Sequence, residues 1–238
     1  MDEFATLATH RIPTAQRPLL GLTVLVVEDS RFACDALRLL CLRSGARIRR
    51  ADCIASARRH LQIYLPSVAI VDMGLPDGSG ATLIEELSQQ TPRIEVVLGM
   101  SGDPFAEDAA IAAGADGFLA KPLNSLAAFQ DAVLSRLPPD RRPCGPRPIV
   151  DDPVVPDPAA YRDDLCHAAD TLENNNPDDV IDYVAQFLAG LALSAQDQPL
   201  HRAAEIVSKG RAKGTVLNAD ISRLSQLVQD RIERQPAI

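Results

Sequence analysis

The sequence predicts an α/β fold, an open doubly wound parallel sheet, followed by a small all-α domain. Three observations lead to this expectation. Short apolar runs alternate with amphipathic stretches over the first 137 residues, a proline-rich segment follows, and only helical patterns come after it. Strands that alternate with helices form parallel sheets covered on both faces. With 238 residues, 46% of them hydrophobic, the chain is long enough for two cores.

Five short runs are the expected strands: 23–27, 46–50, 68–72, 95–100 and 117–120. The run at 46–50 carries three arginines, which suits an edge strand with one side toward water. Apolar residues at helical spacing follow the strands, and the last helix of this part is expected at about 125–137. In such a sheet, ligands bind at the carboxyl ends of the strands.

The proline-rich segment marks the domain boundary. Eight prolines lie between positions 138 and 158, which favours an extended, semi-rigid spacer. The predicted organisation is an N-terminal tail at 1–20, the sheet domain at 21–137, a linker at 138–157 and an all-α domain at 158–238. Residues 1–150 have a net charge of −1 and residues 151–238 one of −7.

Composition excludes several classes of function. The net charge of −8 argues against a protein that coats nucleic acid or anionic membranes, because both need clustered positive charge. The five cysteines form no Cys-x-x-Cys pair, which suits a reducing compartment. The most apolar early run, at 19–27, is too short to span a bilayer. We therefore expect a cytoplasmic protein without membrane contact.

Acidic residues follow two of the expected strands. Glu28 and Asp29 close the first strand and Asp72 closes the third, while Ser101 follows the fourth and Lys121 ends the fifth. Because the carboxyl ends of parallel strands share one edge, these side chains should converge. Clustered carboxylates are costly unless a cation relieves them. Oxygen ligands without His or Cys indicate Mg²⁺, which prefers one or two carboxylates plus a phosphoryl oxygen.

Four motifs in this order resemble the receiver domain of two-component response regulators. They are VLVVEDS at 24–30, VDMGLPDGSG at 71–80, GMSG at 99–102 and GADGFLAKP at 114–122. Each motif alone is weak, but four in the right order, each ending an expected strand, form a specific pattern. The resemblance covers about half the chain and implies a flavodoxin-like sheet of five strands.

The resemblance also implies roles for site residues. Asp72 would be the phospho-acceptor, a carboxylate nucleophile that forms an acyl phosphate. Asp29 would ligate Mg²⁺ directly and Glu28 largely through water, with the backbone carbonyl of Gly74 as a further ligand. Lys121 would pair with a phosphoryl oxygen. The donor would be a sensor histidine kinase or a phosphotransfer protein.

The same resemblance implies a conformational switch. Ser101 would donate its hydroxyl to a phosphoryl oxygen, and Phe118, where Tyr is often found, would rotate into the space left behind. Gly74 stands where the family usually has a bulkier residue. We expect it to leave the site more open and to shorten the lifetime of the phosphoryl group.

The second half predicts four helices and no familiar output module. An apolar stripe, Leu217, Ile221, Leu224 and Val228, fits either the core of a small bundle or a short dimer seam. The stretch around His167 could be a phosphotransfer bundle, but it lacks the Lys-Gly that usually follows such a histidine.

We therefore expect a signalling switch that catalyses only its own phosphorylation and dephosphorylation, and not an enzyme of metabolism. Its helical domain would contact an unidentified protein or form a homodimer. Two alternatives remain open: an atypical DNA-binding transcriptional regulator, which the acidic charge disfavours, and a phosphorelay that ends at His167.

Overall fold

The structure, a computed structural model, describes residues 12–145, 153–174, 177–215 and 218–234. Its centre is a five-stranded parallel sheet in the order β2-β1-β3-β6-β7. The strands are β1 (Thr23–Val27), β2 (Arg47–Ala51), β3 (Val68–Asp72), β6 (Val96–Ser101) and β7 (Gly117–Ala120). This confirms the predicted doubly wound, flavodoxin-like sheet, with the arginine-rich strand β2 at one edge.

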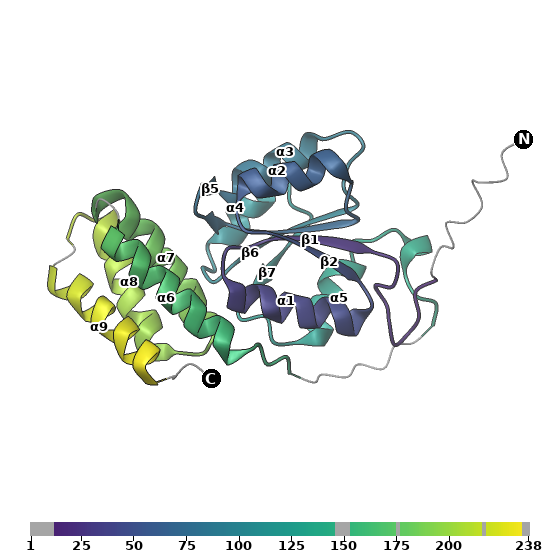
Figure 1. Ribbon diagram of the computed structural model, residues 1–238. Coiled ribbons are helices and arrows are strands. Elements are labelled where there is room, and N and C mark those ends of the chain that lie inside the picture. Colours follow the sequence, from purple (N-terminus) through teal and green to yellow (C-terminus); the bar gives the residue numbers. More distant parts are fainter. Residues whose placement is uncertain (1–11, 146–152, 175–176, 216–217, 235–238) are drawn as a thin grey trace, which may run out of the picture.

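Helices cover both faces of the sheet (Figure 1). Helices α1 (Arg31–Ser44) and α5 (Leu126–Leu134) share one apolar core with one face. Helices α2 (Ile54–Ile63), α3 (Gly80–Gln89) and α4 (Ala106–Ala112) pack on the other face. A small antiparallel hairpin, β4 (Gly74–Leu75) and β5 (Gly78–Ser79), was not predicted as strands. It surrounds the turn sequence Pro-Asp-Gly at 76–78.

The second half of the chain forms a helical bundle, α6 (Pro158–Asn174), α7 (Pro177–Ser194), α8 (Gln198–Ala212) and α9 (Asn218–Arg234). Leu224 and Val228 of the predicted stripe are buried in its core, and Ile221 packs against that core. These three side chains therefore serve the bundle interior, whereas Leu217 lies outside the described residues.

Packing of the sheet domain extends past its predicted bounds. Leu19, which falls in the predicted tail, is fully buried in the core beside α1, and its N–H donates to the carbonyl of Ser44 at 2.9 Å. Val154, in the predicted linker, is buried in the same core and bonds through its N–H to the carbonyl of Asn124 at 3.0 Å. Single apolar side chains outside any periodic pattern can cover a core, and periodicity does not reveal them. A short 3₁₀ turn, Pro139–Arg141, follows α5 in the chain.

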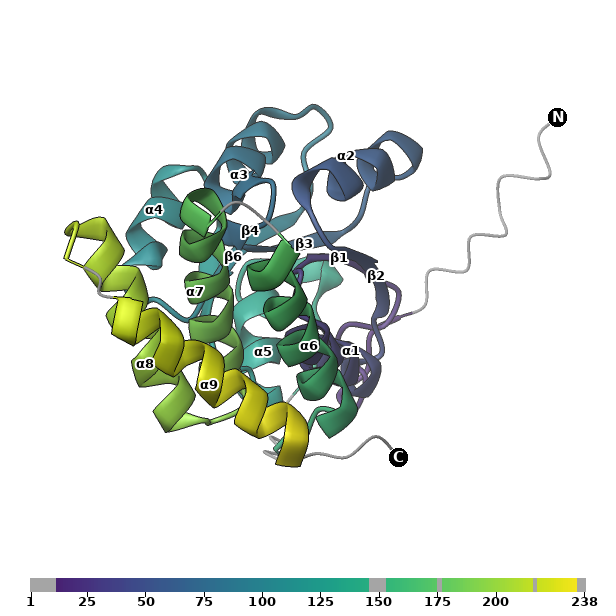
Figure 2. The same cartoon turned by 60° about the vertical axis from the view of Figure 1, so that its left-hand side comes forward.

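The bundle packs against the sheet domain at the carboxyl edge of the sheet and the start of α1 (Figure 2). Phe32 of α1 belongs to the core of the bundle, where its ring meets Tyr161 of α6 edge-on at a centroid distance of 5.6 Å. The proline-rich spacer does not by itself predict this contact. The bundle therefore lies over the edge where the sequence places the functional residues.

The cysteines form no disulfide, and two of the five are buried, Cys34 and Cys41. In the part of the chain that the structure describes, every helix is too short or too polar to cross a membrane.

Candidate functional site

The register of the sheet brings the predicted site residues to one edge. Strand β1 pairs with β3 so that Val27 lies beside Val71, and β3 pairs with β6 so that Asp72 lies beside Met100. The strands therefore end nearly level with one another. Some residues end a strand and others directly follow one. Although these residues are far apart in sequence, they meet in space.

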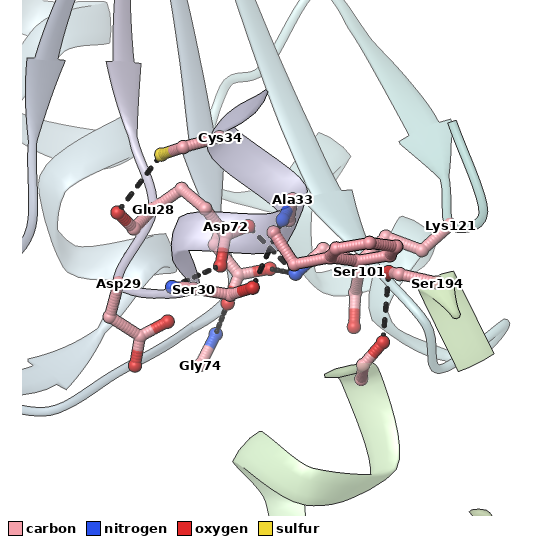
Figure 3. Close-up of polar contacts among 12 residues, drawn as sticks. Glu28, Asp29, Ser30, Ala33, Cys34, Asp72, Gly74, Ser101, Lys121 and Ser194 are labelled. Carbon is pink, nitrogen blue, oxygen red and sulfur yellow. Dashed lines mark hydrogen bonds and ion pairs between the residues drawn. The ribbon is translucent and has the colours of Figure 1, made fainter. Parts of the chain in front are cut away.

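Lys121 joins two of the carboxylates. Its Nζ lies 2.7 Å from Oε2 of Glu28 and 2.9 Å from Oδ1 of Asp72. The three side chains are 9% exposed or less, so solvent screens these ion pairs little. Figure 3 shows Glu28 and Asp72 converging on Lys121, with Asp29 to one side. Although burial alone would lower the pKa of Lys121, Asp72 and Glu28 raise it above its usual value, so the ammonium keeps its charge.

Backbone amides hold the same carboxylates. The N–H of Gly74 donates to Oδ2 of Asp72 at 3.1 Å, and the N–H of Ser30 donates to Oε1 of Glu28 at 3.0 Å. The Ser30 hydroxyl in turn caps α1 by accepting from the N–H of Ala33 at 3.0 Å. These bonds fix the orientation of both acids.

The acid cluster carries more negative charge than its one lysine offsets. Burial raises the pKa of Glu28 to about 7, against the opposing effect of Lys121. The pKa of Asp72 is likewise raised to about 7, by burial first, with Lys121 lowering it and Glu28 raising it further. Burial and the charge of Asp72 also raise the pKa of Asp29. All three groups would give up protons more readily beside an added cation.

The cluster fits a hard divalent cation. Carboxylate oxygens of Glu28, Asp29 and Asp72 lie within 4.8 Å of one another. The donors are oxygens only, and such sets favour Mg²⁺ over softer metals. The buried excess of negative charge is the structural feature that a bound cation would relieve. A role for the carbonyl of Gly74 as a ligand stays a prediction.

Gly80 is required for the close approach of α3 to the end of β3. A Cβ atom at this position would lie 2.0 Å from the backbone oxygen of Asp72. No side chain can be placed there without moving either the helix or the strand end. The glycine at the end of the second motif thus allows α3 to begin directly beside Asp72.

Ser101 and Phe118 lie on the neighbouring strands β6 and β7, and the predicted switch stays a prediction. Ser101 is buried at the end of β6, and its hydroxyl accepts from the N–H of Asp103 at 3.1 Å. Phe118 is half-buried on β7, where one of its ring atoms would lie 3.2 Å from a Cβ placed on Gly99.

One face of α7 lies along the site. Tyr183, Gln186, Gly190 and Leu193, spaced by three, four and three residues, form this face, which we call the α7 site face. The Tyr183 hydroxyl donates to Oδ2 of Asp29 at 2.7 Å. A Cβ on Gly190 would lie 3.9 Å from Nζ of Lys121. The face thus reaches the ends of both β1 and β7, and Figure 3 shows the helix segment that bears Ser194, in green, close to the cluster.

The expectation that Gly74 opens the site is wrong. A Cβ at Gly74 would lie 2.5 Å from Nε2 of Gln186, so the space above this glycine holds a side chain of α7. Because Gly74 has no side chain, α7 can pack close to β4, and Asp72 stays shielded from solvent. The expected effect on the phosphoryl lifetime loses its basis, because it assumed an open site.

Between α7, α8 and the strand ends lies a cavity of about 490 Å³. Asp72, Lys121, Ser101 and Gly190 line it, and so does His201 of α8. His167 is not among its lining residues. This histidine is exposed on α6, where its ring packs edge-on against Phe187. His167 thus lies apart from the cavity at Asp72, and a phosphorelay that ends at this exposed histidine stays a prediction.

Sequence reasoning missed the contributions of the bundle to the site, above all Tyr183, Gln186 and Asp164. Asp164 of α6 accepts from the Ser30 hydroxyl at 2.7 Å and from the backbone N–H groups of Arg31 and Phe32 at 2.9 and 3.0 Å. The only available signal was polar or small residues at helical spacing in the otherwise apolar α7. That pattern does not say which surface the face meets.

Comparison with known proteins places the sheet domain in a known family. Residues 24–133 match the family model of the response regulator receiver domain. This part of the chain is therefore a receiver domain of the type found in two-component response regulators. The match ends before the helical bundle begins.

Curated relatives match over a similar length. The chain is 33% identical over 101 residues to the KDP operon transcriptional regulatory protein KdpE of Escherichia coli. The matched region covers 42% of this chain and 45% of KdpE. It is 30% identical over 102 residues to the virulence transcriptional regulatory protein PhoP of Salmonella typhimurium, covering 42% of this chain and 46% of PhoP. Each match thus spans less than half of the relative.

Solved structures match over about half of the chain. A two-component response regulator from Clostridium difficile is 24% identical, with 48% of this chain and 97% of that chain covered and a TM-score of 0.43. The receiver domain of a signal transduction histidine kinase from Syntrophus aciditrophicus is 27% identical, covers 48% of this chain and 90% of that chain, and has a TM-score of 0.42.

Proposed function

We propose that this chain is a response regulator that accepts a phosphoryl group on Asp72 from a histidine kinase or a phosphotransfer protein. The observation that supports this most strongly is the buried Asp72 carboxylate, 2.9 Å from the Lys121 ammonium and beside two further acids. A nucleophile, a fixed cation and a ligand set for a second cation are the parts that phosphoryl transfer to a carboxylate needs.

In the proposed reaction, an oxygen of Asp72 attacks the phosphorus of a phosphohistidine. A P–O bond forms while the P–N bond breaks, and the electron pair of the broken bond stays on the imidazole nitrogen. The imidazole leaves as a neutral ring because its other nitrogen carries a proton. Water later attacks the acyl phosphate and restores the Asp72 carboxylate together with inorganic phosphate.

Lys121 and Ser101 would stabilise the transferred group. The Lys121 ammonium already lies beside Oδ1 of Asp72, so a small movement brings it to a phosphoryl oxygen bonded to that carboxylate. Ser101, buried at the end of the neighbouring strand, would donate its hydroxyl to another phosphoryl oxygen. Donors placed before the reaction contribute most, since they need no reorganisation.

Asp29 and Asp72 would hold Mg²⁺ directly, and Glu28 largely through water. Bound there, the ion would supply positive charge opposite the phosphoryl oxygens during transfer. Glu28 orients Lys121 through its 2.7 Å ion pair, which keeps the ammonium between the two acids.

The helical bundle would transmit the signal by protein contact, either with a target or with a second copy of the chain. Two residues of its basic cluster already pair with acids. Lys209 pairs with Glu205 at 2.7 Å, and Arg211 pairs with Asp182. This pairing, together with the acidic charge of the bundle, supports a protein partner. The chain would then be a switch that turns over only its own phosphoryl group.

Incubation with acetyl phosphate and Mg²⁺, followed by intact mass measurement, tests the proposal. We expect one phosphoryl group per chain, removable by hydroxylamine, which cleaves acyl phosphates. Asp72→Asn should abolish the label. Asp103→Asn, a change of the same kind in an exposed carboxylate that lines the cavity, should still take it up. A label that persists in Asp72→Asn would overturn the assignment.

A further inference from the structure

We propose that the helical bundle is an intramolecular cover of the acceptor site, and that docking of this cover and binding of Mg²⁺ oppose each other. This inference rests on the proposed function, because it concerns access to Asp72. It adds an interaction surface. Before phosphorylation, the edge of the receiver that holds Asp72 is in contact with α6 and α7 of the same chain.

The first argument is the bond between Tyr183 and Asp29. The hydroxyl donates to Oδ2 of Asp29 at 2.7 Å, and Tyr183 is half-buried. A cation bound by the same carboxylate would stand about 2.0–2.1 Å from its oxygen and would repel the hydroxyl proton. The hydroxyl and the cation therefore compete for this oxygen of Asp29.

The second argument is the close fit of the α7 site face to the strand ends. Glycines stand at three places where α7 and the strand ends approach each other. The contact at Gly74 is with Gln186, and a Cβ on Gly102 would lie 2.9 Å from Cδ2 of Leu193. Gly190, on the helix itself, faces Lys121. A side chain at Gly74 or Gly102 would have to displace Gln186 or Leu193, so these two glycines permit the close contact.

The third argument is the anchor at Asp164. This carboxylate is 2% exposed, and it accepts three hydrogen bonds from the start of α1. The first N–H groups of a helix have no partner within the helix, and the helix dipole favours an anion there. Phe32, whose N–H is one of these donors, also inserts its ring into the bundle core. Polar and apolar contacts thus hold the start of α1 to the bundle. Ser30, which donates to Asp164, directly follows Asp29 in the sequence.

Together these contacts block the approach of a protein donor. A kinase or phosphotransfer protein must bring a histidine side chain to Asp72, and α7 occupies that approach. The remaining cavity of about 490 Å³ has the volume of a small-molecule site and cannot admit a folded donor. Transfer from a protein therefore requires the bundle to move away.

The coupling works in both directions. If Mg²⁺ favours the uncovered site, then docking weakens Mg²⁺ binding by the same factor by which Mg²⁺ weakens docking, and weaker docking gives tighter Mg²⁺ binding. Mg²⁺ and the phosphoryl group would in turn release the α7 site face for another partner. Affinity for Mg²⁺ alone therefore reports on the cover, with no kinase needed.

Isothermal titration of Mg²⁺ into the full chain at pH 8 tests the role of Tyr183. Tyr183→Phe removes only the hydroxyl, and we expect about tenfold tighter binding, the effect of one charge-assisted hydrogen bond. The matched control is Tyr64→Phe, which removes a hydroxyl that contacts His60 at 3.2 Å at the end of α2. That control should bind as the wild type does.

Asp164→Asn tests undocking without touching Asp29. Coulomb's law alone predicts weaker Mg²⁺ binding when an anionic group near the site becomes neutral. Undocking predicts the opposite sign, tighter binding by about tenfold. Asp163→Asn is the matched control, since it makes the same charge change one residue away in an exposed pair with Arg31.

The outcomes separate the two proposals. Tighter binding in Tyr183→Phe and Asp164→Asn, but not in their controls, supports the cover. Equal affinities in the wild type and all four variants overturn the cover and leave the proposed function standing. Failure of every protein, the wild type included, to bind Mg²⁺ overturns the proposed function and the cover with it.

Discussion

The receiver half and the helical half place their functional side chains by different means. In the receiver, Glu28, Asp72 and Lys121 meet because parallel strands end at one edge, and each is buried and held by an ion pair or a backbone amide. In the bundle, Tyr183 and Gln186 are aligned by the helix repeat, and their meeting with the site depends on how two domains dock.

The difference teaches where sequence patterns carry information. Strand ends converge whenever a parallel sheet forms, so acidic residues at those ends are enough to indicate a site. A helix face carries no such instruction about its partner. The receiver therefore holds the chemistry, while the bundle determines when that chemistry is accessible.

The largest effect should come from Lys121→Met, which leaves two buried carboxylates without their cation. We expect a loss of about 3–5 kcal/mol in the free energy of unfolding at pH 8 without Mg²⁺. Urea denaturation followed by circular dichroism measures it. Addition of Mg²⁺ should restore part of the loss, because the ion replaces the missing charge. A loss below about 1 kcal/mol would show that the ion pairs are not buried as described.

The acid cluster should also make the metal-free protein lose stability as pH rises. Glu28 has a folded pKa of about 7 against an ordinary value of 4.5, so the folded state binds its proton more tightly than the unfolded state does. This contribution is fully present below about pH 4.5 and is lost as pH rises through about 7, a change on the order of 3 kcal/mol.

Urea unfolding at a series of pH values checks this, with Glu28→Gln as the comparison. The wild type should lose stability relative to the variant between about pH 5 and pH 8, and saturating Mg²⁺ should remove the difference. A wild type that instead gains stability relative to Glu28→Gln over that range would contradict the raised pKa of this buried acid.

In the bundle, a cluster that is more exposed than the Lys121 cluster should matter less. Asp197 caps α8 through the N–H of Leu200 at 3.1 Å, accepts from the Tyr161 hydroxyl at 3.0 Å and pairs with Arg231 at 2.7 Å. We expect Asp197→Ala to cost about 2 kcal/mol of unfolding free energy, since solvent screens part of these contacts. A cost equal to that of Lys121→Met would remove the contrast between the two halves.

The smallest effect should come from the exposed pair between Arg31 and Asp163. Both side chains are more than half exposed, although the atoms lie 2.7 Å apart. Arg31→Ala should change stability by at most about 0.5 kcal/mol and leave Mg²⁺ affinity unchanged. A change of several-fold in affinity would mean that surface charge, and not the buried Asp164 anchor, holds the bundle in place.

Much of the receiver could be predicted, and little of the cover. The alternation of strands and helices, the edge position of β2 and the convergence of Asp72 with Lys121 follow from local pattern and sheet topology. The burial of Leu19 and Val154 could not be predicted, because isolated apolar residues show no period. The contact of Gln186 with Gly74 could not be predicted either, because a missing side chain indicates open space as readily as a close neighbour.

A reversible disulfide between the two halves tests the central claim most directly. A Cβ on Gly102 would lie 4.0 Å from Cβ of Leu193, within the range of about 3.5–4.5 Å found in disulfides. The variant Gly102→Cys/Leu193→Cys, with Cys144→Ser to remove the exposed thiol, can be locked by oxidation and released by reduction.

The measurement is the rate of phosphoryl incorporation from acetyl phosphate with Mg²⁺, in the oxidised and the reduced form of the same protein. The reduced form is its own control for the two substitutions. If docking opposes Mg²⁺, the oxidised form should react at least about tenfold more slowly, and reduction should restore the rate. Equal rates in the two forms would contradict the claim that docking of the bundle opposes Mg²⁺ binding.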